Sequence, residues 1–269
     1  MKIRPLDREA LRRSYSQAKP YPFIHIENFL EPEFALEVAR SYPTFESATG
    51  QGREFKTVNE KRKVQIMDVA RFPAPVKALN DAIASQPFLD DLSYVTGIPK
   101  LLWDEQLLGG GMHVTGPGGR LDVHVDFNFV EDRKLHRRIN LLLYLNPEWN
   151  PQWGGEVQLW DREVTRCQHA FAPKLNRCVI FETSDISFHG VTPVTEDAPF
   201  ARCSFAAYYY TREAPAHWKG EYHSTIFKAR PEEPVRRYLL MPAEKLQREV
   251  RSQVGKAKKQ VKRILGMPG

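Results

Sequence analysis

The first part of the chain combines charged stretches with apolar residues at helical spacing. Residues 8–17 follow Asp7, whose carboxylate is a good helix N-cap, and Pro32 stands where a second helix would begin. The apolar run between them, residues 21–30, predicts a strand followed by a turn. The N-terminal third is therefore predicted to be mainly helical.

A further helix is predicted in residues 74–97, with Gly97 as its stop. Its apolar positions are spaced as on one helical face: Val76, Leu79 and Ile83. The preceding segment, residues 52–68, is polar and basic with mild alternation, so it fits either a flap or a hairpin.

From about residue 101 the pattern changes to short β-rich runs separated by turn signals such as PGG, NP and GG. Eight such runs follow one another: residues 109–116, 121–127, 138–146, 155–161, 168–173, 177–183, 188–194 and 201–211. Many short strands at close spacing indicate a β-sandwich or jelly roll. Residues 243–265 then predict a C-terminal amphipathic helix with apolar residues near one face: Leu246, Val250, Val254, Val261 and Leu265.

Composition narrows the class of protein. With 42% hydrophobic and 27% charged residues and no long apolar run, the chain of 269 residues is expected to have no membrane span. Its charged N-terminus lacks the pattern of a secretory signal, which predicts a cytoplasmic location. The three cysteines lack metal-knuckle spacing and are interpreted as space-filling residues.

The net charge of +6 is concentrated near the C-terminus, where residues 244–263 hold eight Lys or Arg against two Glu. The remainder is close to neutral, so no nucleic-acid partner is expected. The basic tail can pack on the domain or form a homo-oligomer, with a membrane surface or a partner helix as alternatives. A second basic group is interpreted as a solvated face, with attraction of an anionic substrate as the alternative: Arg53, Lys56, Lys61, Arg62 and Lys63.

His124 and Asp126 form the strongest local chemical signal. They stand two residues apart on a predicted strand, so alternation turns both side chains to one face. His189, at the start of a later run, can supply a third ligand, because distant strands meet at the mouth of a jelly roll. Two imidazoles and one carboxylate form a facial triad that suits Fe(II). Taken singly, each of these residues more often has a structural role than a ligand role.

Arg202 changes this balance. It begins the apolar strand 201–210, where alternation places Arg202 and Ser204 on one face. A buried arginine needs an anionic partner, and the distal carboxylate of 2-oxoglutarate would supply one. A salt bridge at the edge of the strand is the alternative.

Residues 112–211 resemble the prolyl 4-hydroxylase-like branch of the Fe(II)/2-oxoglutarate dioxygenases and are similar to the hypoxia-sensing type of prolyl hydroxylase. The motifs that carry the resemblance run in order: GPGG, HVD, a strand ending in YLNPEW, GGEVQLWD, FHGV and an Arg-x-Ser strand. The resemblance implies a double-stranded β-helix (jelly roll). Together with the hydrophobic patterns, it predicts an α+β, mainly β fold of one domain: residues 1–100 as N-terminal supporting helices, residues 101–212 as the jelly-roll catalytic core, and residues 213–269 as an extension with the C-terminal amphipathic basic helix.

The resemblance also implies that His124, Asp126 and His189 hold the iron and that Arg202, with the phenol of Tyr144, binds 2-oxoglutarate. Ser204 is a weaker cosubstrate contact. His113 stands where the family often has tyrosine, so its contact with cosubstrate or substrate is open.

The implied activity is O₂-dependent hydroxylation of an unactivated C–H bond in a small molecule or a peptidyl residue, with release of succinate and CO₂. Desaturation, cyclisation and epimerisation can use the same site. The alternatives are a non-catalytic cupin- or lectin-like binding module, and an interaction protein that works through its basic tail.

Overall fold

The computed structural model describes residues 2–216, 218 and 220–243. The α-helices are α1 (Arg8–Gln17), α2 (Pro32–Arg40), α3 (Phe45–Thr49), α4 (Ala74–Ala84) and α5 (Gln86–Thr96), and shorter helical turns are η1 (Val69–Arg71), η2 (Pro151–Trp153) and η3 (Arg236–Leu240). Asp7 caps α1 by accepting a hydrogen bond from the Ala10 amide, and Pro32 occupies the first turn of α2. Both predicted helix starts are confirmed.

The single helix predicted in residues 74–97 is wrong in one respect, because the chain forms two helices there. Ser85 adopts an extended conformation between α4 and α5, and Pro87 lies in the first turn of α5. Proline has no amide hydrogen to donate to the preceding turn, so the first helix cannot continue through it. Gly97, with φ of 71°, ends α5 as predicted.

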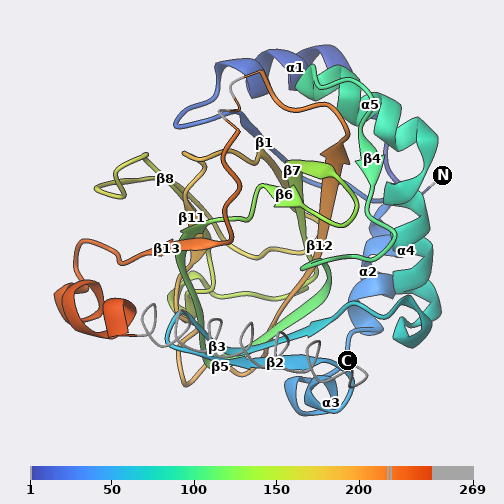
Figure 1. The fold of residues 1–269 in the computed structure, drawn as a ribbon. Helices are drawn as coiled ribbons and strands as arrows, with labels where there is room; N and C mark the ends of the chain where they lie inside the picture. The colour runs from blue at the N-terminus through green and yellow to red at the C-terminus, as the bar shows by residue number, and fades with distance from the viewer. Residues whose placement is uncertain (1, 217, 219, 244–269) are drawn as a thin grey trace, which may run out of the picture.

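The strands form one curled antiparallel sheet (Figure 1). They are β1 (Phe23–Ile26), β2 (Arg53–Lys56), β3 (Glu60–Ile66), β4 (Leu102–Trp103), β5 (Gly111–Val125), β6 (Phe129–Val130), β7 (Leu135–Tyr144), β8 (Val157–Trp160), β9 (Cys167–Phe171), β10 (Cys178–Glu182), β11 (His189–Val191), β12 (Arg202–Thr211) and β13 (Ile226–Lys228). The main path runs β1-β10-β7-β12-β5-β11-β8-β9. The predicted double-stranded β-helix is confirmed.

Two of the eight predicted runs, residues 109–116 and 121–127, are parts of the single long strand β5. The strand passes through the GPGG sequence, where Gly118 has φ of 73° and an added Cβ would collide with the Glu196 side chain. The part of β5 before this point pairs with β12, and the part after it pairs with β11 and β13. β5 therefore connects the strands on the β12 side of the sheet with those on the β11 side.

The segment that fitted either a flap or a hairpin is a hairpin. Strands β2 and β3 pair antiparallel, and β3 pairs along β5 (Figure 1). We call residues 53–66 the flap hairpin. Its inner residues, including Phe55 and Lys63, line the cavity described below.

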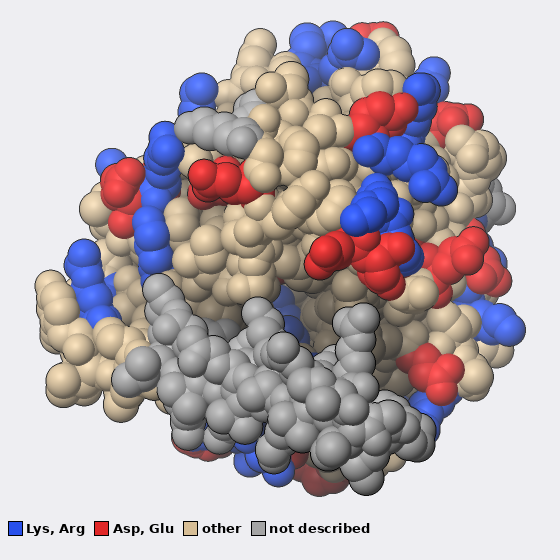
Figure 2. Space-filling model, in the orientation of Figure 1, with Lys and Arg blue, Asp and Glu red and all other residues tan. Residues whose placement is uncertain are grey.

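The helices support one side of the sheet. Val76, Leu79 and Ile83 of α4 are fully buried in a core shared with Phe205 of β12, and Figure 1 shows α2, α4 and α5 along that side. On the face shown in Figure 2, Lys and Arg are interspersed with Asp and Glu.

Among the described residues, no helix is long and apolar enough to cross a membrane. The predicted C-terminal amphipathic helix, residues 243–265, lies almost wholly outside the described part of the chain. The division into residues 1–100, 101–212 and 213–269 stays a prediction.

Candidate metal and cosubstrate site

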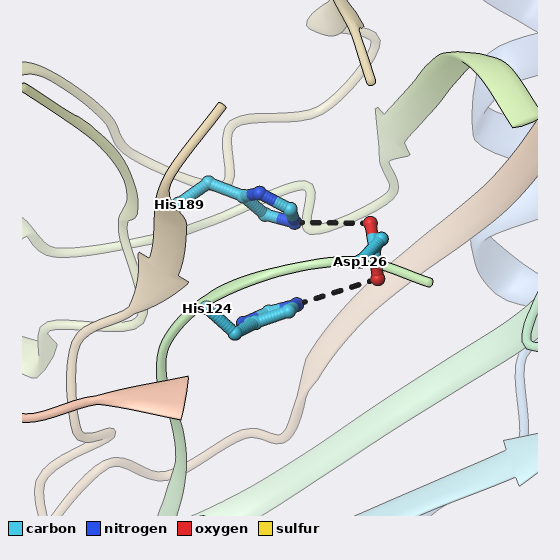
Figure 3. Close-up of side chains that lie close together, drawn as sticks. All are labelled: His124, Asp126 and His189. Carbon is cyan, nitrogen blue, oxygen red and sulfur yellow. Dashed lines mark ion pairs between the residues drawn. The ribbon is translucent and has the colours of Figure 1, made fainter. Parts of the chain in front are cut away.

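The three candidate ligands meet at the mouth of the barrel (Figure 3). His124 lies near the end of β5, Asp126 directly follows that strand, and His189 opens β11, where it pairs opposite His124. His124 Nε2 lies 3.5 Å from Asp126 Oδ1, and His189 Nε2 lies 3.4 Å from Asp126 Oδ2. All the candidate ligand atoms are within 4.8 Å of one another.

Backbone contacts orient both imidazoles. His124 Nδ1 donates to the Asp122 carbonyl at 2.8 Å, and His189 Nδ1 donates to the Ser187 carbonyl at 2.9 Å. The lone pair of each Nε2 is therefore free to face Asp126. Burial and the neighbouring His124 lower the pKa of His189 to about 3, so this imidazole is neutral at pH 7.

Asp126 is held by two side chains that the sequence reasoning missed. Arg137 Nη2 and Asn140 Nδ2 donate to Asp126 Oδ2 at 2.9 and 2.8 Å. Burial raises the pKa of a carboxyl group, but Arg137 and the two imidazoles outweigh this and hold the pKa of Asp126 well below its ordinary value. The carboxylate is therefore ionised and oriented before any metal binds.

Arg137 is itself fixed by aromatic packing. Its guanidinium lies 3.5 Å from the ring centroid of Tyr208 and 4.7 Å from that of Phe127. The side chain is buried, and Asn140 Oδ1 accepts two further hydrogen bonds from it. The signal in the sequence was the polar pair Arg137 and Asn140 within the apolar strand β7, which needs buried partners.

Arg202 and Ser204 lie together, as alternation predicted. Both line the cavity, Arg202 Nε donates to the Gly155 carbonyl at 2.7 Å, and Nη1 donates to Ser204 Oγ at 3.2 Å. Arg202 is buried, and burial lowers its pKa. In the part of the chain that the structure describes, no carboxylate pairs with it.

Tyr144 lies next to Arg202 but not on the cavity wall. Its ring centroid is 5.0 Å from the Arg202 guanidinium carbon, and its buried hydroxyl has no hydrogen-bond partner among the described residues. Burial raises the pKa of Tyr144 to about 12, with Arg202 opposing part of the rise. The Tyr144 hydroxyl is thus buried beside a cation that has no acidic partner among the described residues.

His113 does line the cavity. Its Nε2 donates to the Gly109 carbonyl at 3.0 Å, and it stands opposite Ser204 in the pairing of β5 with β12. Burial, Lys63 and Arg202 hold the pKa of His113 well below its ordinary value, so the ring is neutral. The cavity has a volume of about 510 Å³ and contains the three candidate ligands together with His113, Arg202 and Ser204.

The side chains fit a divalent first-row metal ion with a carboxylate cosubstrate. Two imidazole nitrogens and one carboxylate converge from one side, which suits Fe(II) and leaves other coordination positions open. Arg202, which has no acidic partner among the described residues, lines the same cavity and is complementary to an anion. Fold and site together define a double-stranded β-helix protein with a candidate mononuclear metal centre.

Comparisons with known proteins identify the domain. Residues 110–210 match the model of the 2OG-Fe(II) oxygenase superfamily. Prolyl 3-hydroxylase OGFOD1 of Mus musculus is 32% identical over 84 residues, which cover 30% of this chain and 15% of the mouse protein. The same protein of Xenopus laevis is 34% identical over 71 residues, covering 25% and 14%. The matched segments thus cover only about one seventh of the length of these curated relatives.

Solved structures share the fold. A Pseudomonas putida prolyl-4-hydroxylase superimposes with a TM-score of 0.51 and 18% identity, covering 77% of this chain and all of that one. A Trichoplax adhaerens prolyl hydroxylase, in complex with a peptide fragment of the hypoxia inducible factor oxygen degradation domain, gives 0.54 and 21%, covering 76% and 90%. Residues 110–210 thus match a 2OG-Fe(II) oxygenase domain, and the fold around them is shared with these two prolyl hydroxylases.

Proposed function

We propose that this chain is an Fe(II)- and 2-oxoglutarate-dependent dioxygenase that hydroxylates an unactivated C–H bond. The observation that carries the proposal is the presence, in one cavity, of the converging His124, Asp126 and His189 and of Arg202, a buried cation without an acidic partner in the described residues. A cupin- or lectin-like binding module has no need for Arg202, so the comparisons and the cavity together do not favour it.

In this proposal His124, Asp126 and His189 hold the metal, and Arg202 binds the distal carboxylate of 2-oxoglutarate. When bound, Fe(II) with 2-oxoglutarate and O₂ supplies the oxidation: one oxygen atom enters succinate as CO₂ leaves, and the other enters the substrate C–H bond. The chain holds Asp126 through hydrogen bonds from Arg137 and Asn140, and backbone carbonyls orient the Nε2 atoms of both imidazoles. Ser204 fixes Arg202, Tyr144 offers its hydroxyl from behind it, and His113 forms the adjoining wall.

A prolyl residue is the first substrate class to test. The curated relatives are named as prolyl 3-hydroxylases, and the Trichoplax neighbour was solved in complex with a peptide. A small molecule is the second class, because SnoN, an epimerase from nogalamycin biosynthesis, shares the fold with a TM-score of 0.51.

The test measures succinate release from the Fe(II)-loaded protein over a panel of proline-containing peptides and small molecules, with mass spectrometry of the products. Asp126→Ala is the inactive control. A gain of one oxygen by a substrate, stoichiometric with succinate, is the expected result. If anaerobic addition of Fe(II) and 2-oxoglutarate gives no visible charge-transfer band and no succinate forms in air, the proposal is wrong.

Three further properties stay predictions from the sequence: a cytoplasmic location, the lack of a nucleic-acid partner, and a homo-oligomer formed through residues 243–265. Cell fractionation, a DNA and RNA binding assay, and light scattering of the full chain compared with one ending at Pro242 test them in turn.

A further inference from the structure

A segment beyond the matched oxygenase domain closes one side of the cavity. Ser224, Thr225 and Phe227 line the cavity, and β13 pairs with β5 so that Phe227 stands opposite His124. The Phe227 and His124 ring centroids are 5.3 Å apart. We call residues 224–236 the strap; it contains β13, which pairs with β5 and is labelled in Figure 1.

Apolar burial contributes little to holding the strap. Ile226 is 45% exposed and Val235 is 59% exposed, while β13 itself is only three residues long. A short edge strand with exposed apolar side chains gains little from the hydrophobic effect. The strap therefore needs another anchor.

That anchor is a group of five charged residues, which we call the Asp122 cluster. Asp122 is fully buried; Arg120 Nε donates to its Oδ1 at 2.9 Å, Arg230 Nη1 lies 3.8 Å from the same oxygen, and Arg236 donates to its Oδ2. Glu233 Oε1 accepts from Arg120 Nη2 at 2.6 Å and lies 3.7 Å from Arg236 Nε. Three of the five residues belong to the strap.

The same cluster also contacts the flap hairpin and the part of β5 that carries His124. Arg236 donates to the Val58 carbonyl, the Asp122 amide donates to the Asn59 carbonyl at 2.8 Å, and the Asp122 carbonyl accepts from His124 Nδ1 at 2.8 Å. Strap, flap hairpin and a candidate metal ligand are thus linked through one buried acid.

We propose that the strap forms a wall of the substrate pocket, in which Phe227 is a specificity-determining residue and Glu233 is a positioning residue. Phe227 limits the space beside His124, and the Asp122 cluster keeps Phe227 there. Loss of one ion pair leaves other buried charges of the cluster unpaired. The cluster therefore forms or breaks as a unit, and the strap is either fully docked on β5 or detached from it. This inference rests on the proposed function, since it places the substrate beside the metal.

Limited trypsin digestion of the metal-free full chain tests the anchor. The reporter is cleavage after Lys228, whose Nζ donates to the Arg162 carbonyl and lies 4.1 Å from the Phe188 ring centroid in the closed strap. Glu233→Gln removes the charge that pairs with the cluster arginines, while Glu232→Gln makes the same change at an exposed neighbour.

We expect cleavage after Lys228 about tenfold faster in Glu233→Gln than in the wild type, the scale of one lost charged hydrogen bond. Glu232→Gln should match the wild type. Equal cleavage rates in both variants would overturn the positioning role. This readout needs neither metal nor turnover, so it is independent of the oxygenase proposal.

The rate of Mn²⁺ release tests whether Phe227 forms a wall of the pocket. Mn²⁺-loaded protein is diluted into excess EDTA, and free Mn²⁺ is followed by electron paramagnetic resonance. Phe227→Ala should release Mn²⁺ severalfold faster than the wild type, whereas Ile226→Ala, at the exposed neighbour, should not. On the peptide panel, Phe227→Ala should raise kcat/KM for bulkier substrates relative to smaller ones.

Equal release from the Phe227 and Ile226 variants, with unchanged substrate preference, would overturn the role of Phe227. Failure of the wild type to bind Mn²⁺ would instead count against the proposed function, while the digestion experiment would still report on the strap.

Discussion

Replacing Arg202 with methionine should have opposite consequences for folding and for cosubstrate binding. Arg202 is 4% exposed, and its guanidinium donates hydrogen bonds to the Gly155 carbonyl and to Ser204 Oγ. An ion held in this way carries a desolvation cost that no acidic partner in the described residues offsets. Methionine has a similar length and no charge.

The magnitudes follow from those contacts. Loss of the bond to Gly155 costs about 1 kcal/mol, and loss of the buried charge recovers a similar amount, so the free energy of unfolding of the cofactor-free protein should change by less than about 2 kcal/mol. Two charged hydrogen bonds from Arg202 to the distal carboxylate are worth roughly 3–6 kcal/mol together. Affinity for 2-oxoglutarate should therefore fall about 10²- to 10⁴-fold.

Urea denaturation measures the first quantity, and anaerobic titration of the Fe(II) protein measures the second. The matched ligand is 2-oxopentanoate, which has the keto-acid group but no distal carboxylate, and its affinity should be similar in wild type and Arg202→Met. The reasoning would be refuted if the variant kept the preference for 2-oxoglutarate, or if it lost more than about 4 kcal/mol of stability without the cosubstrate.

Three further predictions concern the metal ligands and the buried histidine. Asp126→Ala should lower the free energy of unfolding of the metal-free protein by about 3 kcal/mol in urea denaturation, because the buried Arg137 loses its acidic partner. The double variant Asp126→Ala with Arg137→Met should regain part of that free energy, since the unpaired charge is then removed. Strictly additive losses in the double variant would contradict this reasoning. Mn²⁺ at 100 times its Kd should stabilise the wild type by about 2.7 kcal/mol and leave Asp126→Ala unchanged in a thermal melt. His113 has a folded pKa well below its ordinary 6.5, so the unfolded chain binds the extra proton and stability is lost as pH falls below about 6.5. His113→Gln should reduce that slope by up to about 1.4 kcal/mol per pH unit in denaturation at several pH values, and an unchanged slope would refute it.

The part of the site that could be predicted from sequence depends on strand alternation. His124 and Asp126, and likewise Arg202 and Ser204, are two residues apart, and two-residue periodicity places each pair on one face wherever the strands lie. The position of His189 could be predicted only if its strand lies beside the strand of His124. The jelly-roll interpretation implied that arrangement, and β11 does pair with β5. The roles of these residues stay proposals, but their convergence is a fact of the fold.

Other features depend on contacts that no local pattern encodes. Asn140 on β7 donates a hydrogen bond to Asp126, which follows β5, and the Asp122 cluster joins residues more than 100 positions apart. The continuity of β5 through GPGG was missed because glycine and proline are ordinary turn signals, yet here the glycines allow one strand to bend.

Strand β5 also sets the order in which the protein can fold during synthesis. Its pairing partners β3, β11, β12 and β13 extend from Glu60 to Lys228 along the chain. Contacts of such long sequence separation form slowly and only after their last partner has left the ribosome. A nascent chain that ends before Arg202 can pair β5 with β3 and β11, but the part of β5 that pairs with β12 still lacks that partner, and the cavity still lacks the Arg202 side chain. The wall of the cavity that β13 forms can close only after residues up to Lys228 have been synthesised.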